Sequence, residues 1–369
     1  MKKNNEKRKK ICFPFIGDSI GGSHKSALIL IDKLNLNFFC PVVVLHRKGP
    51  LENLLKKKKI KYKVLKLKRI IGEKKGFLSL FFSILTSNFK LVFFILKNNI
   101  KIIHTNDTGS HLTWALPAFI TNNKLIWHLR NLYPRWKLFY FFSLFPKKIL
   151  CISKFVKKSV PNIYKNKTCI ILNPIDIKKS KKESNYKLNC KKKDFVIGFI
   201  ANFWNRKKPF TFIELAKRII TKKNNVFFVI AGTDREITKE ILKKEINKFK
   251  LKNKIQLLDF VDPIEPLLRS INLLFVPSVN EPSGRTLVES MGMRTPVIAN
   301  KSGGHTEIIN DKFNGWLCNI NNMTDTTNLV LKIIKDKKYL EHITGNAFFF
   351  AKKNFDSKNH VKNISYFYN

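Results

Sequence analysis

The chain is 369 residues long, which exceeds the usual size of one hydrophobic core, so we expect two domains. Hydrophobic residues make up 44% of it and include 32 Phe, a composition that argues against disorder of the whole chain. Lys and Arg number 71 against 25 Asp and Glu, but this formal charge of +46 comes without any nucleic-acid-binding signature, so nucleic acid is not an expected partner.

The chain begins with a basic stretch and a first run of buried strands. The basic residues 1–10 precede an apolar run that breaks at Gly17-Asp18, which predicts a first strand rather than a signal peptide, so secretion is not expected. Short apolar runs between helical patterns predict buried parallel strands. They lie at residues 11–16, 41–46, 100–105, 124–129, 148–153 and 168–173.

The most hydrophobic window is Phe77 to Leu96, with Asn88 and Lys90 at its middle. These polar residues argue against a membrane-spanning helix. Two interpretations remain: buried helices packed on a sheet, or an amphipathic segment at a membrane surface. Residues 138–145 allow the same two interpretations.

A polar, Lys-rich stretch at 178–194 interrupts this pattern and is predicted to be a linker. A second series of strands follows at 195–200, 226–232, 254–260, 272–278 and 295–300. Strands alternating with helices predict an α/β protein with two Rossmann-like, doubly wound parallel-sheet domains that face each other across a cleft. The predicted ranges are 1–177 and 195–345, with a helix at 346–369 that either stays separate or packs back on the N-terminal domain.

Six cysteines lack CxxC spacing and metal-ligand partners. Neither a zinc site nor a disulfide framework is therefore indicated, and a reducing cytoplasm fits this usage.

The sharpest candidate site starts at Glu281 and ends at Glu289, directly after the predicted strand at 272–278. A strand, a Gly-containing turn and a helix would place backbone N–H groups at a helix N-terminus, which suits a diphosphate or sugar hydroxyls. The turn is Ser283-Gly284-Arg285-Thr286. Both carboxylates are spaced to line one pocket and to accept hydrogen bonds from hydroxyl groups.

These residues resemble a known family. Two Glu separated by seven positions, followed by Gly292, TPVIA at 295–299 and GGHTEII at 303–309, are similar to the signature of family GT4, the group 1 glycosyltransferases of GT-B fold. The resemblance implies a retaining transferase in which Glu289 binds ribose hydroxyls and Glu281 contacts the transferred sugar. SKFVKK at 153–158 and NPID at 173–176 resemble the segments that close the family's first domain.

The resemblance also implies phosphate-binding residues. Gly21 and Gly22, in GGSHKS, correspond to a glycine loop that approaches the donor phosphate or the acceptor. Lys208 matches one cation that neutralises the leaving diphosphate, and the second is either Arg206 or Lys207, because Asn202 stands where many members have Arg.

Candidate residues of the first domain follow two of its strands. His128 stands at a strand end where similar enzymes place a histidine beside the donor sugar, and Arg130 follows it. Asn106, Asp107 and His111 follow the preceding strand and are candidates for contacting the acceptor.

The expected function is transfer of a sugar from a UDP- or GDP-sugar to a glycan or lipid-linked acceptor, as in envelope polysaccharide, lipopolysaccharide or lipid-linked glycan synthesis. No metal or other cofactor is expected, because no DxD-like motif is suitably placed. Two alternatives stay open: a nucleotide-sugar epimerase of similar fold, and a non-catalytic protein that binds polyanions or membrane surfaces through its charge. The expected location is the cytoplasm, either free or peripheral on the inner face of the cytoplasmic membrane.

Overall fold

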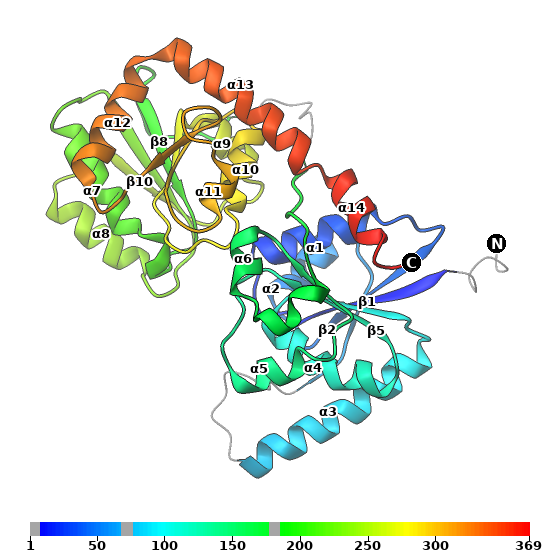
Figure 1. The fold of residues 1–369 in the computed structure, drawn as a ribbon. Coiled ribbons are helices and arrows are strands. Elements are labelled where there is room, and N and C mark those ends of the chain that lie inside the picture. The colour runs from blue at the N-terminus through cyan, green and yellow to red at the C-terminus, as the bar shows by residue number, and fades with distance from the viewer. Residues whose placement is uncertain (1–7, 68–76, 177–184) are drawn as a thin grey trace. The chain divides into compact units, whose positions relative to one another are not determined.

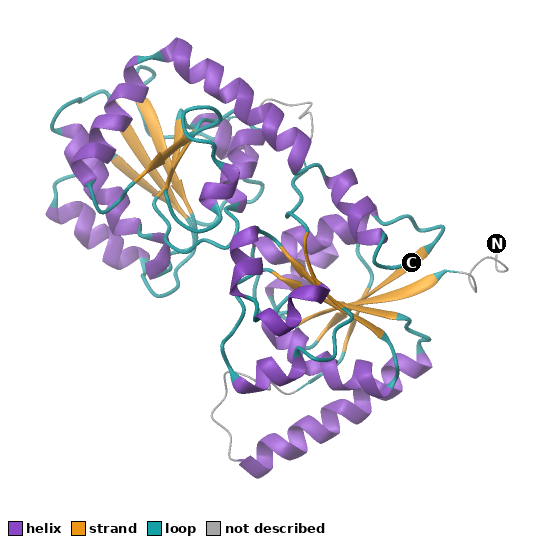
Figure 2. Ribbon diagram, viewed as in Figure 1, coloured by secondary structure: helices purple, strands orange, loops and turns teal. Residues whose placement is uncertain are grey.

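The computed structural model describes residues 8–67, 77–176 and 185–369, apart from the side chains of residues 77–85 and 337. The chain forms two compact units, Met1–Pro174 with Ser357–Asn369, and Ile175–Asp356. Each contains one parallel sheet between layers of helices (Figures 1 and 2).

The first unit is built on a seven-stranded parallel sheet with strand order β3-β2-β1-β4-β5-β6-β7. Its strands are β1 (Lys9–Phe15), β2 (Phe39–Leu45), β3 (Tyr62–Val64), β4 (Ile102–Thr105), β5 (Lys124–Leu129), β6 (Lys148–Cys151) and β7 (Thr168–Ile170). Its helices are α1 (Gly22–Lys33), α2 (Pro50–Lys57), α3 (Phe77–Lys97), α4 (Thr108–Ile120), α5 (Lys137–Phe142), α6 (Lys154–Ser159), the 3₁₀ helix η1 (Asn162–Lys167) and α14 (Ser357–Ser365).

Both faces of this sheet are buried, as near-continuous apolar strands require. Leu125 packs in a core with Trp114 and Phe139, while the next residue, Ile126, packs in a second core with Leu28 of α1. Successive side chains of a strand point to opposite faces, so α3, α4 and α5 cover one face, and α1, α2 and α14 cover the other.

The second unit has a six-stranded parallel sheet of order β10-β9-β8-β11-β12-β13. Its strands are β8 (Phe195–Ile200), β9 (Val226–Ala231), β10 (Ile255–Leu258), β11 (Leu273–Val276), β12 (Val297–Asn300) and β13 (Trp316–Cys318). Its helices are η2 (Asn205–Lys207), α7 (Pro209–Ile220), α8 (Lys239–Lys248), α9 (Glu265–Ser270), α10 (Arg285–Gly292), α11 (His305–Ile308), α12 (Met323–Lys335) and α13 (Lys337–Asn354). The order reverses between β8 and β11, the switch point at which doubly wound sheets bind ligands.

The predicted fold class of two doubly wound parallel sheets is confirmed. All eleven apolar runs form strands, whereas β3 and β13, each three residues long, were not predicted. The window from Phe77 is one helix, α3, and residues 137–142 form α5. Among the described residues, none of the helices combines the length and the hydropathy that crossing a bilayer requires.

The units divide the chain at positions that differ from the predicted ranges. Residues 346–356 complete α13 and its following turn in the second unit, and residues 357–369 belong to the first unit, where α14 packs on α1. Of the predicted linker, residues 178–184 lie outside the described part of the chain. Tyr186 is hydrogen-bonded to Ser270 of the second unit, its backbone N–H donating to the Ser270 hydroxyl over 2.6 Å.

Candidate functional site

The loops that follow β8, β11 and β12 meet at the switch point of the second unit. The Val279 N–H donates to the carbonyl oxygen of Arg206 over 2.9 Å, and the Gly304 N–H donates to that of Glu281 over 2.7 Å. These backbone bonds fix three loops against one another. The predicted donor-binding residues of the second unit therefore lie in one region.

Glu281 is the electrostatic centre of this region. Its Oε2 atom lies 2.6 Å from Lys207 Nζ and 2.8 Å from Arg206 Nη1, and its side chain is only 12% exposed. Burial on its own would raise the pKa of Glu281, but the charges of Lys207 and Arg206 outweigh it and lower the pKa to about 2. The carboxylate is therefore ionised at neutral pH and holds both cations.

Glu289 has a different partner. Its Oε1 atom accepts a hydrogen bond of 2.8 Å from Arg285 Nε, one turn earlier on α10, and both side chains are largely buried. The pair links the first turn of α10 to its last. Ser283, just before the helix, is buried, and Thr286 is half-buried in the first turn.

Gly284 occupies the N-cap of α10 with φ +92°, a left-handed conformation that favours glycine. A Cβ at Gly304 would lie 2.8 Å from the carbonyl oxygen of Pro282, so this second glycine permits the loop after β12 to touch the loop after β11. Gly284 is favoured by its backbone conformation, and Gly304 by the close approach of the Pro282 carbonyl group. Both glycines lie in backbone close to the start of α10.

His305 is a residue of this region that the sequence did not single out. It is fully buried, and its Nδ1 atom lies 2.9 Å from the carbonyl oxygen of Asn300, which makes Nδ1 the donor. Nε2 has no hydrogen-bond partner among the described residues. Burial lowers the pKa of His305, and the charge of Glu281 only partly restores it, so the ring is neutral at pH 7. The sequence feature that could have identified His305 is its place in the GGHTEII segment at 303–309.

Lys208 is exposed at the N-cap of α7 with φ +57°, and within the described parts of the chain its side chain makes no ion pair. Its neighbour Lys207 is 17% exposed and bound to Glu281, whereas Arg206 is 43% exposed. Both candidates for the second cation thus contact the same carboxylate.

In the first unit, Arg130 connects two polar residues at the carboxyl ends of the strands. Its Nη2 atom donates to Asn106 Oδ1 over 2.9 Å, and its Nη1 atom donates to Asn173 Oδ1. All three side chains are buried. Asn173, in the NPID segment, was not predicted as a site residue.

Asp107 is the N-cap of α4, and its Oδ1 atom accepts the Ser110 N–H over 2.7 Å. Burial raises the pKa of Asp107 to about 6, and Oδ2 has no hydrogen-bond partner among the described residues. The charges of Asp18 and Arg130 both act on His24, whose pKa burial lowers to about 4. Asp18 and His24, after β1, therefore belong with this group, although neither was predicted.

The predicted histidines are interior residues. His128 is fully buried, with Nδ1 3.3 Å from Nε2 of His104, whose own Nδ1 lies 2.5 Å from the Tyr368 hydroxyl. Burial first, and then the charge of Arg130, hold the pKa values of His104 and His128 well below the ordinary range. His111 is also buried, and its Nδ1 lies 2.5 Å from Thr105 Oγ1.

The predicted glycine loop opens α1 of the first unit. Gly21 is the N-cap of this helix, and its N–H donates to His24 Nδ1 over 3.1 Å. Gly22 is the first helical residue. The candidate residues thus form two groups, one at the carboxyl ends of the strands in each unit.

Comparison with solved structures defines the class of fold. A glycosyltransferase from Rickettsia africae aligns over 98% of this chain and 98% of its own, with a TM-score of 0.81 and 20% identity. The Anabaena protein Alr3699/HepE, solved in complex with UDP-glucose, covers 97% of this chain and 98% of its own, with a TM-score of 0.78 and 19% identity. The chain has the GT-B fold.

Sequence comparison finds similar proteins. Residues 180–348 match the family model described as glycosyl transferases group 1. The uncharacterized glycosyltransferase MJ1178 of Methanocaldococcus jannaschii is 28% identical over 211 residues, 56% of this chain and 55% of that protein. The UDP-Gal:alpha-D-GlcNAc-diphosphoundecaprenol alpha-1,3-galactosyltransferase of Escherichia coli is 27% identical over 154 residues, 41% of this chain and 39% of that protein. The chain spans about half or less of the length of these curated relatives.

Proposed function

We propose that this protein is a retaining glycosyltransferase that transfers a sugar from a UDP- or GDP-sugar to a hydroxyl group of a glycan or lipid-linked acceptor. The observation that carries the proposal is the arrangement at the switch point of the second unit. There, within the segment that matches group 1 glycosyl transferases, Glu281 precedes α10 and forms ion pairs with Arg206 and Lys207.

The donor would be bound by two kinds of group. The diphosphate carries negative charge, which Arg206, Lys208 and the N–H groups at the start of α10 complement. Hydroxyl groups of the ribose and the transferred sugar donate to the carboxylates of Glu289 and Glu281, respectively. Alr3699/HepE, which has a similar fold, was solved with UDP and UDP-glucose, in keeping with a nucleotide-sugar donor.

The proposed chemistry is departure of the diphosphate from the face that the acceptor attacks. The bond from the anomeric carbon to the phosphate oxygen breaks, the bond to the acceptor oxygen forms, and the departing phosphate oxygen takes the acceptor proton. Lys208 stabilises the negative charge that develops on the leaving group. Glu281 is committed to two cations, so we do not assign it as a nucleophile. No metal ion is required in this scheme.

The acceptor is proposed to be an envelope polysaccharide, lipopolysaccharide or lipid-linked glycan. Relatives named for such reactions support this class, among them the O-antigen biosynthesis glycosyltransferase WclY of Escherichia coli, 29% identical over 162 residues. Of the predicted residues in the first unit, Asn106, Asp107 and Arg130 would position the acceptor, whereas His111 is an interior residue bound to Thr105.

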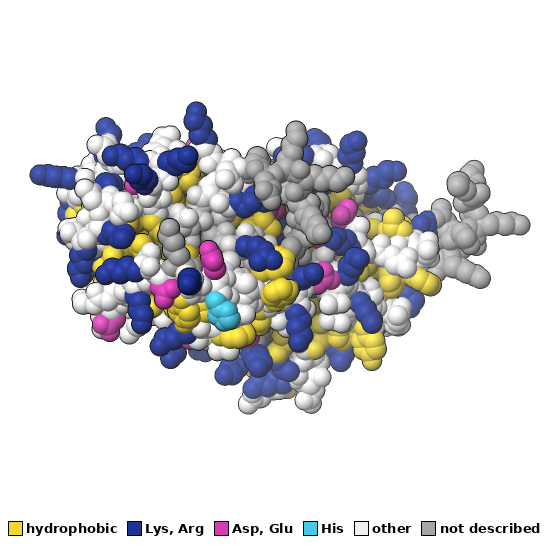
Figure 3. Space-filling model, turned by 90° about the horizontal axis from the view of Figure 1, so that it is seen from above, with side chains coloured by type: hydrophobic (Ala, Val, Ile, Leu, Met, Phe, Trp, Pro, Cys, Tyr) yellow, Lys and Arg dark blue, Asp and Glu magenta, His cyan; other side chains and the backbone are white. Residues whose placement is uncertain are grey.

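We also propose that the protein works at an anionic membrane surface. Large apolar side chains are exposed on α3 and α5, and Lys97 Nζ lies 5.6 Å from the ring centre of Phe93. The exposed residues on these helices are Phe89, Phe93, Leu96, Leu138, Tyr140 and Phe141. On the face that Figure 3 shows, Lys and Arg side chains are spread out rather than gathered in one patch, which does not favour a dedicated polyanion groove there.

The proposed function is tested by measuring nucleotide release from UDP- and GDP-sugars with lipid-linked and polysaccharide acceptors, and by determining the anomeric configuration of the product by NMR. We expect transfer with retention from one donor. Lys208→Gln should lower kcat about a hundredfold or more, whereas Lys222→Gln, an exposed lysine after α7, should leave it unchanged. An inverted product, an epimerised donor or equal activity of both variants would contradict the proposal.

A further inference from the structure

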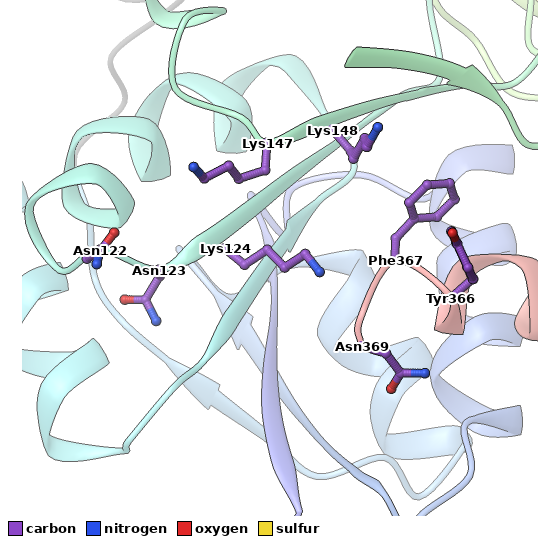
Figure 4. Close-up of a pocket in the computed structure, with 8 residues that line it drawn as sticks. All are labelled: Asn122, Asn123, Lys124, Lys147, Lys148, Tyr366, Phe367 and Asn369. Atoms are coloured by element: carbon purple, nitrogen blue, oxygen red, sulfur yellow. The ribbon is translucent and has the colours of Figure 1, made fainter. Parts of the chain in front are cut away.

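A pocket of about 790 Å³ lies in the first unit, away from the candidate residues described above (Figure 4). Lys124 and Lys148 are the first residues of β5 and β6, so the pocket lies at the amino-terminal edge of the parallel sheet. Arg130 follows the other end of β5, six residues and roughly 20 Å along the strand. The lining residues are Asn122, Asn123, Lys124, Lys147, Lys148, Tyr366, Phe367 and Asn369.

Three lysines bring positive charge to this pocket, and none of the lining side chains is acidic. Within the described residues, Lys124, Lys147 and Lys148 make no ion pair, and the lining contains no Asp or Glu. Burial lowers the pKa of Lys124, and the charges of Lys9 and Lys148 lower it further, so a fourth cation lies nearby. Mutual repulsion of this kind is relieved when an anion binds.

Apolar side chains border the same pocket. The rings of Tyr366 and Phe367 are 5.5 Å apart, and Figure 4 shows them on the opposite side of Lys124 from Asn122. Outside the lining, α4 ends two residues before Asn122 with the exposed Phe119 and Ile120, and the Phe119 ring lies 5.0 Å from that of Phe145. A ligand that fits both features carries an anionic group next to an apolar part.

We propose that this pocket binds a phosphate group, and that its apolar border favours the head group of an anionic membrane phospholipid as the source. The ammonium groups of Lys124, Lys147 and Lys148 bind the phosphate oxygens, and the bordering aromatic rings lie against the start of the acyl chains. The proposal rests on the membrane-surface part of the proposed function and is independent of sugar transfer.

The test compares two variants that remove the same charge. The pocket variant carries Lys124→Gln, Lys147→Gln and Lys148→Gln, and the control carries Lys222→Gln, Lys243→Gln and Lys244→Gln on the exposed surface of the second unit. Flotation with vesicles of phosphatidylglycerol and phosphatidylcholine measures lipid binding, and calorimetric titration with inorganic pyrophosphate measures binding of the soluble anion. Melting temperatures establish that both variants fold, and the single change Lys147→Gln replaces the triple variant if it does not.

We expect the pocket variant to bind the anionic vesicles at least about tenfold more weakly than the wild type, and the control to change much less. If the pocket variant loses pyrophosphate binding but still binds vesicles like the wild type, the pocket is a phosphate site whose ligand is soluble rather than a lipid. Equal behaviour of the two variants in both assays would overturn the site. Thermal stabilisation by a nucleotide sugar should be the same in both variants, so failure here is distinguishable from failure of the proposed transferase activity.

Discussion

Glu281 keeps its negative charge although its side chain is largely buried, because Arg206 and Lys207 both contact the same oxygen. A carboxyl group whose pKa is lower in the folded state stabilises the fold at pH values above its ordinary pKa. With a folded pKa of about 2 against an ordinary 4.5, this contribution is lost as the pH falls from about 4.5 towards 2.

Replacing Glu281 with Gln should therefore destabilise the protein at pH 6 by on the order of 3 kcal/mol. The difference from the wild type should shrink as the pH approaches 2. Denaturant unfolding at pH 6, 4 and 3 measures both quantities. Glu214→Gln is the control, because its pair with Arg218 is more exposed and should contribute about 0.5 kcal/mol or less. A Glu281→Gln deficit that stays constant over this pH range would contradict the assigned pKa.

The hydroxyl of Tyr368 is the hydrogen-bond partner of the buried ring of His104. Tyr368→Phe removes the hydroxyl and leaves Nδ1 of His104 unpaired in the core, so we expect a loss of about 1–3 kcal/mol in unfolding free energy. Tyr366 is 77% exposed, so Tyr366→Phe should change the unfolding free energy by less than about 0.5 kcal/mol. Similar effects of the two changes on the melting temperature would show that the buried bond contributes nothing.

At the residue scale, the charged residues of the site were easier to predict from the sequence than the contacts between them. Glu281, Arg206 and Lys207 were all selected, because chemistry and position in a strand–turn–helix pattern are visible in sequence. Their mutual contact was not, since it joins loops 74 and 75 residues apart. His104 and His305 were missed for a related reason: a buried histidine in an apolar strand or a short helix resembles any core position until its neighbours are known.

Two glycines determine how the elements of the second unit approach each other at the candidate donor site. Gly304→Ala should place a methyl group 2.8 Å from the Pro282 carbonyl oxygen and push apart the loops after β11 and β12. We expect donor affinity to fall about tenfold or more while the fold persists. Gly345→Ala in α13, where a Cβ meets nothing within 4 Å, is the matched change and should leave affinity intact. Titration of each variant with the nucleotide sugar decides between these expectations.

The final helix, α14, belongs to the core of the first unit, although the whole second unit precedes it in sequence. Ile364 is fully buried in the core that contains Leu28 of α1. Ile364→Ala should cost about 2–4 kcal/mol in unfolding free energy, whereas Lys362→Ala on the exposed face should cost little. Calorimetric melting compares the two, and equal melting temperatures would mean that α14 does not stabilise the first unit.

Short apolar runs and their alternation with helical patterns sufficed to predict eleven strands and the fold class. The edge strands β3 and β13 are three residues long, like β7, but they lack the longer apolar run at 168–173 from which β7 was predicted. The packing of α14 on the first unit depends on contacts between residues far apart in sequence. One example is the hydrogen bond between Tyr368 and His104, which are 264 residues apart. Patterns along the chain carry no record of such contacts.

The whole molecule combines a formal charge of +46 with two parallel-sheet units. A protein that acts through this charge alone would bind polyanions with an affinity that falls steeply as salt increases. Recognition of a nucleotide sugar rests on close contacts in one region of the second unit and should depend far less on salt. Salt dependence therefore separates the proposed transferase from a polyanion-binding protein.

The most direct test is thermal stabilisation of the protein by a panel of UDP- and GDP-sugars at low and high salt, with the variants Glu289→Ala and Glu214→Ala. Both glutamates pair with an arginine four positions away on a helix, and only Glu289 lies in the candidate donor site. We predict that one donor stabilises the wild type by about 2.7 kcal/mol at a hundred times its Kd. The effect should persist at high salt and in Glu214→Ala and be lost in Glu289→Ala. Absence of stabilisation by every donor, or its survival in Glu289→Ala, would contradict the proposed site.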